Sequence, residues 1–167
     1  MGGNVLNKFI FSAALIGCAT LASAQDKKVE DGKYSDKDGV PTYNIQADGT
    51  VDWYTYSGFR RYHSDCHVCH GPDGLGSTYA PGLVDSVKKL SYEDFQSIVA
   101  NGRQVTGASG ASVMPAFGTN PNVMCYLDDI WVYLKARAEG GLERNRPQKR
   151  EDQPATAKEY EKTCMGG

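Results

Sequence analysis

The chain has 167 residues, of which 40% are hydrophobic and 23% charged, and its formal net charge is -2. This composition is typical of a globular protein, and the length left after removal of a leader suits one small domain with appendages. A net charge this close to zero indicates no strong attraction of the whole molecule to nucleic acid or acidic lipid, so we expect no nucleic-acid partner.

Residues 1–24 have the features of a secretory signal peptide. Lys8 supplies a positive charge, Phe9 to Leu21 is mostly apolar, and Ala22-Ser23-Ala24 forms a small-residue cleavage site. The apolar run is too short to span a bilayer comfortably. We therefore expect an exported, periplasmic protein without a membrane span.

A lipoprotein is the alternative for this leader. Leu15-Ile16-Gly17-Cys18 resembles a lipoprotein cleavage box, and cleavage there would leave Cys18 as a lipidated first residue.

Residues 25–56 are predicted to form an irregular N-terminal arm. The segment is polar and carries the turn signals Asp31-Gly32, Asp38 to Pro41 and Asp48 to Val51. Because only short apolar or β-branched pieces lie between these turns, we expect no more than one weak hairpin.

Residues 57–140 are predicted to form an all-α domain with three helices. Helical signals cover Gly58–His63, Ser91–Asn101 and Asn120–Gly140. Ser91 is a capping serine followed by acids, and Asn120-Pro121 supplies an N-cap and a first-turn proline. Gly58 shares a helix face with Tyr62, and a glycine there allows the last helix to cross closely.

Cys66-His67-Val68-Cys69-His70 fits the haem attachment pattern C-x-x-C-H. Two thiols at this spacing can each add to one vinyl group of a haem, and the histidine that follows lies under the iron. The alternatives are a thiol redox pair and half a zinc site. Both fit poorly, because the other cysteines are isolated and no βαβ alternation is visible. We predict one covalently bound haem c, attached through Cys66 and Cys69, with His70 as a metal ligand.

Met114 is predicted to be the second iron ligand. It precedes Pro115 in an extended, nearly uncharged loop from Val105 to Phe117, and the proline restrains the backbone, which helps a weak thioether stay on the metal. The alternatives are a buried, gap-filling role for this methionine, an open iron face, and ligation by Met124, His63 or His67.

Two further groups are predicted to support the haem. A backbone carbonyl near Pro81 can accept the Nδ1 proton of His70, although Pro81-Gly82 also fits a simple turn. Arg103 is the predicted partner of a haem propionate, because a carboxylate favours a forked cationic donor; Arg60 and Arg61 are alternatives, and each of the three also fits a solvated surface residue.

The aromatic residues Trp53, Tyr54 and Tyr56 have two interpretations. They anchor the arm on the domain, or one of them packs on the haem edge or donates a hydrogen bond to a propionate.

Residues 141–167 are predicted to form a C-terminal extension. Their composition alone is typical of disorder, yet Ala155–Lys162 favours a short helix. In an oxidising compartment two leftover cysteines usually pair, so we predict a disulfide between Cys125 and Cys164 that tethers the tail; two free thiols are the alternative. A loop of about forty residues closed in this way contributes about 3 to 4 kcal/mol of stability.

These residues resemble the class I c-type cytochromes. The broad resemblance rests on Cys66 to His70, Pro81 and Met114. A narrower resemblance, to the four-cysteine c-type cytochromes of methanol metabolism that include cytochrome c-553i, rests on Asp52 to His63 and on Met124 to Asp129. It implies a monohaem class I cytochrome c fold, and a periplasmic single-electron carrier between a quinoprotein (PQQ) alcohol or methanol dehydrogenase and a downstream cytochrome or terminal oxidase.

With both iron faces filled, we expect outer-sphere electron transfer and no enzymatic activity. The redox partner is expected to dock near Cys66 to Cys69 and Ala108 to Ser112, where small uncharged residues permit close approach. The alternatives are a peroxidase-like haem enzyme and a redox sensor with an open iron site. Met114 argues against the enzyme, and the length leaves no room for the output domain that a sensor needs.

Overall fold

The computed structural model describes residues 27–107 and 110–166. The predicted signal peptide and Cys18 lie outside the described residues. The elements, in chain order, are β1 (Lys28–Glu30), β2 (Lys33–Ser35), β3 (Pro41–Thr42), α1 (Trp53–Asp65), α2 (His67–His70), η1 (Pro72–Gly74), α3 (Leu83–Ser86), α4 (Tyr92–Asn101), β4 (Arg103–Gly107), β5 (Gly110–Met114), α5 (Pro121–Met124), α6 (Leu127–Ala138) and α7 (Ala155–Cys164).

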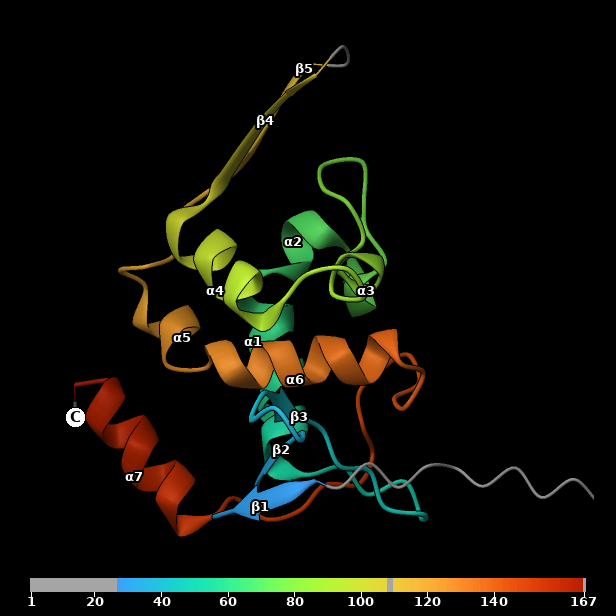
Figure 1. The fold of residues 1–167 in the computed structure, drawn as a ribbon, viewed down its shortest axis with the longest axis vertical. Coiled ribbons are helices and arrows are strands. Elements are labelled where there is room, and N and C mark those ends of the chain that lie inside the picture. The colour runs from blue at the N-terminus through green and yellow to red at the C-terminus, as the bar shows by residue number, and fades with distance from the viewer. Residues whose placement is uncertain (1–26, 108–109, 167) are drawn as a thin grey trace, which may run out of the picture.

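The fold is mainly helical and is organised around the crossing of α1 and α6 (Figure 1). A Cβ atom at Gly58 would lie 1.8 Å from the carbonyl oxygen of Asp129 and 2.8 Å from Cβ of Tyr133. The backbones therefore meet at a distance that only glycine permits. Tyr62, Tyr133 and Leu134 are fully buried beside this contact, so the predicted crossing at Gly58 is confirmed.

Helix α1 is longer than the sequence suggested. The prediction that it begins at Gly58 is wrong, because the helix starts at Trp53. Asp52 caps it: one carboxylate oxygen accepts the backbone N–H of Thr55 at 2.9 Å, and the other accepts the Thr55 hydroxyl at 2.5 Å. This side chain satisfies a donor of the first turn that would otherwise have no partner.

The last predicted helix is divided in two. Asn120 caps α5 as expected, with its side chain accepting the N–H of Asn122 at 3.0 Å. Helical geometry is then interrupted at Tyr126, whose φ is -128° and ψ 21°, and α6 begins at Leu127. The prediction of one continuous helix is wrong, since the chain leaves helical geometry at Tyr126, and Asp128, in the first turn of α6, stabilises a new helix N-terminus.

The predicted helix from Ser91 to Asn101 is confirmed as α4, capped by Ser91. The segment that follows differs from the expected extended loop, because β4 and β5 pair as an antiparallel hairpin. Figure 1 shows this hairpin projecting from the body, on the same side of α6 as α2, α3 and α4. Val105, Thr106 and Val113 are β-branched, which favours strands over coil.

The arm forms a three-stranded antiparallel sheet in the order β1-β2-β3. Asp31 and Gly32 turn β1 into β2 with φ values of 50° and 78°, which is the left-handed pair that a two-residue hairpin needs. The predicted hairpin is thus present, and it gains a third strand.

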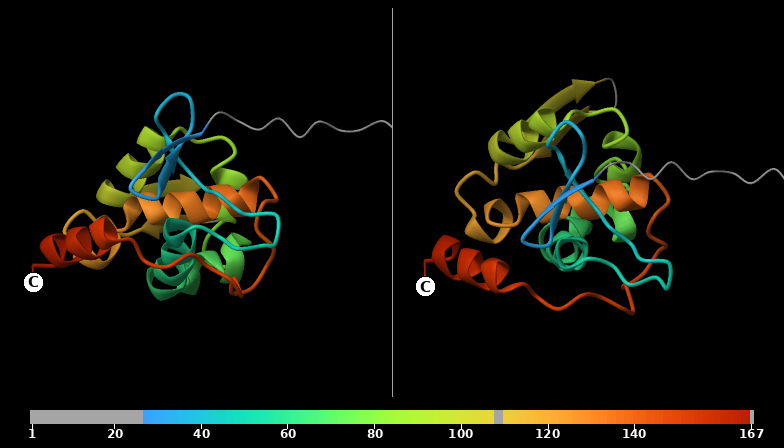
Figure 2. Two further views of the ribbon diagram at one scale, coloured as in Figure 1. Left: turned by 90° about the horizontal axis from the view of Figure 1, so that it is seen from below. Right: turned by 60° about the horizontal axis from the view of Figure 1, so that its bottom comes forward.

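The C-terminal extension lies against the end of the N-terminal arm. The N–H of Val51 donates to the carbonyl of Lys149 at 3.2 Å, and the N–H of Glu151 donates to the carbonyl of Val51 at 2.9 Å. Figure 2 shows α7, in red, at the C-terminal end of the tail. The tail is therefore ordered by a partner that lies about one hundred residues away in the sequence.

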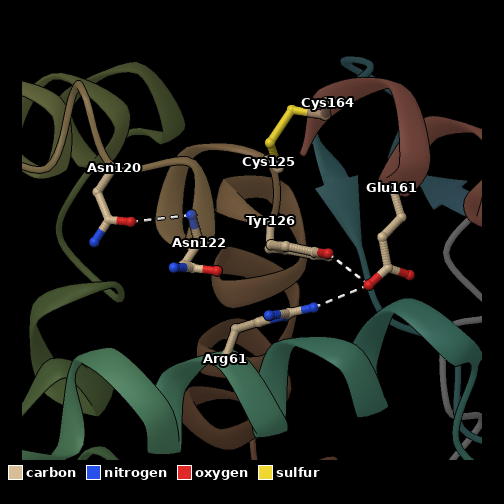
Figure 3. Close-up of a disulfide and its surroundings, with 7 residues drawn as sticks. All are labelled: Arg61, Asn120, Asn122, Cys125, Tyr126, Glu161 and Cys164. Carbon is tan, nitrogen blue, oxygen red and sulfur yellow. Dashed lines mark hydrogen bonds and ion pairs between the residues drawn. A yellow bond between two sulfur atoms is a disulfide. The ribbon is translucent and has the colours of Figure 1, made fainter. Parts of the chain in front are cut away.

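The predicted disulfide between Cys125 and Cys164 ties α7 to the junction of α5 and α6 (Figure 3). Glu161 reinforces it by accepting hydrogen bonds from Arg61 at 3.1 Å and from the Tyr126 hydroxyl at 2.6 Å. The Arg61 guanidinium also lies 3.5 Å from the centre of the Tyr126 ring.

Candidate haem site

The predicted attachment motif forms one short helical turn. Cys66 ends α1 and precedes α2, and its carbonyl accepts the backbone N–H of His70 at 3.0 Å. Neither Cys66 nor Cys69 is in a disulfide. Cys69 is exposed and Cys66 is half-buried, so both thiols are available on one short segment.

His70 is buried, and its ring is oriented by Pro81. Its Nδ1 atom lies 2.8 Å from the Pro81 carbonyl oxygen. A carbonyl can only accept, so Nδ1 carries the proton and Nε2 keeps a lone pair for a metal. Such a bond also makes the imidazole a better donor.

Tyr62 holds the backbone of the histidine segment. Its hydroxyl donates to the carbonyl of Gly71 at 2.5 Å and approaches that of His70 at 3.2 Å. The N–H of Gly76 also donates to the His70 carbonyl, at 2.7 Å. Sequence reasoning gave Tyr62 a packing role only. Its position four residues before Cys66, one helical turn away, is the signal that indicates more.

Met114 is the last residue of β5 and pairs with Arg103, the first residue of β4. Met114 is half-buried and packs against the hydrophobic core. Met124, the competing methionine, lines a cavity of about 360 Å³ beside α7 together with Arg60 and Arg61. The attachment motif contributes no residue to that cavity, so this geometry favours Met114 as a ligand.

Of the alternative histidines, His63 is engaged elsewhere and His67 packs against it. His63 Nδ1–H donates to the Phe59 carbonyl at 2.8 Å, and its Nε2 lies 3.8 Å from Asp73. The ring of His67 stacks on that of His63 at a centroid distance of 5.7 Å. His63 is thus held within α1, whereas His67 is the first residue of α2 and its buried Nδ1 has no hydrogen-bond partner among the described residues.

The predicted arginines divide between two places. Arg61 pairs with Glu161, and Arg60 lines the cavity beside α7. Arg103 is exposed at the base of the hairpin. Among the three, Arg103 belongs to the hairpin that also carries Met114.

The aromatic residues that precede Gly58 contact the arm and tail. The guanidinium of Arg150 lies 5.1 Å from the ring centre of Trp53 and 4.9 Å from that of Tyr56. The Tyr54 hydroxyl donates to the Asp31 carbonyl at 3.4 Å. These contacts favour the anchoring interpretation over a haem contact.

Exposed apolar side chains are concentrated in the part of the sequence that carries the attachment motif and the hairpin. Eight large hydrophobic side chains are exposed among the described residues, and five of them fall between residues 68 and 113. They are Val68, Leu75, Tyr79, Val105 and Val113. Exposed apolar side chains are stabilised when a partner or an apolar cofactor covers them.

Neither a side-chain metal cluster nor a membrane-spanning helix is present among the described residues. In residues 27–107 and 110–166, no group of three or more His, Cys, Asp or Glu side chains is arranged to hold a metal ion. The same ranges contain no helix with the length and apolar character needed to cross a membrane.

The sequence is similar to those of known c-type cytochromes. Residues 55–134 match the family described as cytochrome c oxidase, cbb3-type, subunit III. The chain is 50% identical over 158 residues to cytochrome c-553I of Paracoccus denitrificans, covering 93% of this chain and 70% of the relative. It is 38% identical over 91 residues to cytochrome c-555 of Methylococcus capsulatus, covering 54% of this chain and 68% of the relative.

A solved structure is also similar, namely that of the c-type cytochrome XoxG from Methylobacterium extorquens AM1. The two chains are 61% identical, with a TM-score of 0.76, and the match covers 82% of this chain and 84% of the other. The protein therefore belongs to the c-type cytochromes, with the class I fold, one covalently bound haem c and electron transfer as its activity.

Proposed function

We propose that this cytochrome is a periplasmic carrier that takes single electrons from a quinoprotein (PQQ) alcohol or methanol dehydrogenase and passes them to a downstream cytochrome or terminal oxidase. The similarity to cytochrome c-553I, to cytochrome c-555 and to XoxG supports a place in this chemistry. The structural observation that supports the carrier role is the fixed orientation of the His70 ring, whose Nδ1–H donates to the Pro81 carbonyl.

The site residues have distinct roles in this proposal. Cys66 and Cys69 would hold the haem through thioethers, and His70 and Met114 would be the ligands of its iron. The Pro81 carbonyl orients His70, and the Arg103 guanidinium would neutralise a propionate. When bound, the haem supplies a one-electron couple, and a thioether ligand raises its potential.

The protein's contribution to electron transfer is rigidity. The His70–Gly71 backbone is held by Tyr62 and Gly76, and the Met114 backbone is paired with Arg103. Because both ligand segments are fixed before the electron arrives, little has to rearrange when the charge changes. This arrangement suits transfer without a substrate-binding step.

A spectrum of the oxidised holoprotein tests the carrier role. We expect a low-spin spectrum with a thioether-to-iron band, and we expect Met114→Ala to lose that band. A high-spin wild-type spectrum would support the open-iron enzyme instead. Met124→Ala is the matched control, since that side chain lines the cavity beside α7.

The donor is identified by mixing the oxidised holoprotein with candidate periplasmic dehydrogenases and their substrates. Rapid reduction by a quinoprotein alcohol dehydrogenase, and slow reduction by unrelated dehydrogenases, is the expected result. Equal rates with all of them would remove the assignment.

Cell fractionation and N-terminal sequencing test the location. A periplasmic protein that starts at Gln25 supports cleavage after Ala24. A membrane-associated protein that starts at a lipidated Cys18 would replace that interpretation.

A further inference from the structure

Gly102 lies where α4 meets the hairpin that carries Met114 (Figure 1). It ends α4 with φ 74° and ψ 179°, a backbone conformation that is essentially restricted to glycine. The next residue, Arg103, already belongs to β4. The direction of the whole hairpin therefore depends on this one residue.

The missing side chain of Gly102 is what lets the methionine segment approach α4. A Cβ atom there would lie 2.6 Å from the Met114 carbonyl oxygen, 2.9 Å from the Ala116 nitrogen and 3.0 Å from the Pro115 carbonyl carbon. All three are backbone atoms, so no side-chain rotation can relieve the overlap. A substitution at Gly102 must displace the chain from Met114 to Ala116.

The residues that follow this segment are held by the last turn of α4. The N–H of Phe117 donates to the Val99 carbonyl at 3.0 Å, and the N–H of Gly118 donates to the Ala100 carbonyl at 2.9 Å. Val99 is buried in the core, so these acceptors do not yield easily. Displacement caused at Gly102 must then be taken up before Phe117, in the segment from Met114 to Ala116.

We propose that Gly102 is the positioning residue for Met114, setting the distance at which the methionine sulfur meets the haem iron. This inference rests on the proposed ligation by Met114. The residue acts through the backbone that it allows to pack closely, and it makes no contact with the haem in this role.

Three glycine variants of the holoprotein separate contact from backbone strain. Gly102→Ala introduces both. Gly140→Ala introduces a side chain at φ 75° with no atom within 4 Å. Gly118→Ala places a Cβ atom 2.9 Å from the Ala100 carbonyl oxygen and so disturbs the same segment by contact.

The readouts are the thioether-to-iron band of the oxidised protein and the affinity of the ferric protein for added imidazole, which competes with the sixth ligand. We expect Gly102→Ala to lose most of the band and to bind imidazole at least about tenfold more tightly than wild type. The reason is that imidazole displaces a weakened bond between Met114 and the iron more easily. Gly118→Ala should lie between this variant and wild type, and Gly140→Ala should match wild type.

Each contrary outcome has a definite meaning. Wild-type band and affinity in both Gly102→Ala and Gly118→Ala would overturn the positioning role, as would an equal loss in Gly140→Ala. If Gly102→Ala yields no holoprotein, Gly118→Ala decides alone. Retention of the band in Met114→Ala would instead overturn the ligand assignment, so the two failures are distinguishable.

Discussion

Arg103 and Met114 are antiparallel partners at the base of the β4–β5 hairpin. The sequence assigned the two residues separately, one to a haem propionate and the other to the iron. Their pairing places both on adjoining strands, so the position of one constrains the position of the other.

Replacing Arg103 by Gln is expected to lower the reduction potential. A cation beside the haem favours the reduced form, which carries one positive charge less, and its loss at this exposed site should amount to about 20 to 40 mV, equivalent to ~0.5 to 1 kcal/mol for one electron. An equilibrium redox titration measures the change. Arg60→Gln is the control, because Arg60 lines the cavity beside α7; equal shifts in the two variants would remove the propionate assignment.

Replacing Tyr62 by Phe is expected to reduce the free energy of unfolding by about 1 to 2 kcal/mol, because the buried Gly71 carbonyl loses the hydroxyl that donates to it. The His70 carbonyl keeps the N–H of Gly76. Tyr133→Phe is a close match, since Tyr133 is equally buried and its hydroxyl has no partner among the described residues. It should stay within about 0.5 kcal/mol of wild type. Denaturant unfolding of both holoproteins checks the difference, and equal losses would contradict the role of the Tyr62 hydroxyl.

Replacing Cys125 and Cys164 together by Ser is expected to cost about 3 to 4 kcal/mol of stability, because the bridge closes a long loop. The visible spectrum should not change, because the disulfide ties α7 to the α5–α6 junction, whereas the predicted haem ligands lie on α2 and β5. Thiol titration of the denatured holoprotein gives a second check. It should find no free group at Cys125 and Cys164 before reduction and two afterwards.

Stability is expected to fall as the pH rises from about 4 to 7 because of Asp129. Burial raises the pKa of this carboxyl from 3.8 to about 7, although a hydrogen bond from Ser57 and the charge of Lys33 oppose the change. Between these two pH values the unfolded chain has released the proton and the folded chain still holds it, so folding loses stability with each step upward. Above the folded pKa the effect is constant.

Asp129→Asn should remove this part of the pH dependence and should be more stable than wild type at pH 8. Denaturant midpoints measured from pH 4 to 8 give the comparison. Asp152→Asn, an exposed carboxyl in the tail, is the control and should follow the wild-type curve. Parallel curves for wild type and Asp129→Asn would contradict the assignment.

Replacing Val68 by Glu is expected to slow electron exchange with the redox partner. Val68 is 68% exposed in the middle of the attachment motif, where the docking site is expected. Val29→Glu is the control, because Val29 is 57% exposed but lies in β1, on the far side of α6. In stopped-flow measurements, the rates of oxidation and reduction by the partner should fall only in the Val68 variant. A loss of about 1.4 kcal/mol of docking energy corresponds to a rate that is roughly tenfold lower. Equal rates in both variants would place the docking site elsewhere. Residues 108–109, which belong to the expected docking region, lie outside the described residues.

Local patterns were sufficient for several features. The motif from Cys66 to His70 has a spacing set by covalent chemistry, and the glycine at 58 was readable as a helix crossing because its partners recur at helical intervals. The disulfide followed from the cysteine count and the expected compartment. In each case the information lies in a few residues whose chemistry depends little on their surroundings.

The start of α1 had a local signal that was missed, since Asp52 caps the helix through Thr55, three residues later. Other features depended on residues that lie further apart. The tail has the composition of a disordered segment, yet it is ordered because Val51 offers its backbone groups to Lys149 and Glu151. The expected loop before Met114 became a strand because Arg103 lies opposite. Spacing along one chain thus determined which groups this cytochrome uses, whereas hydrogen bonds and packing between distant segments determined how they are held, since those contacts have no local signature in the sequence.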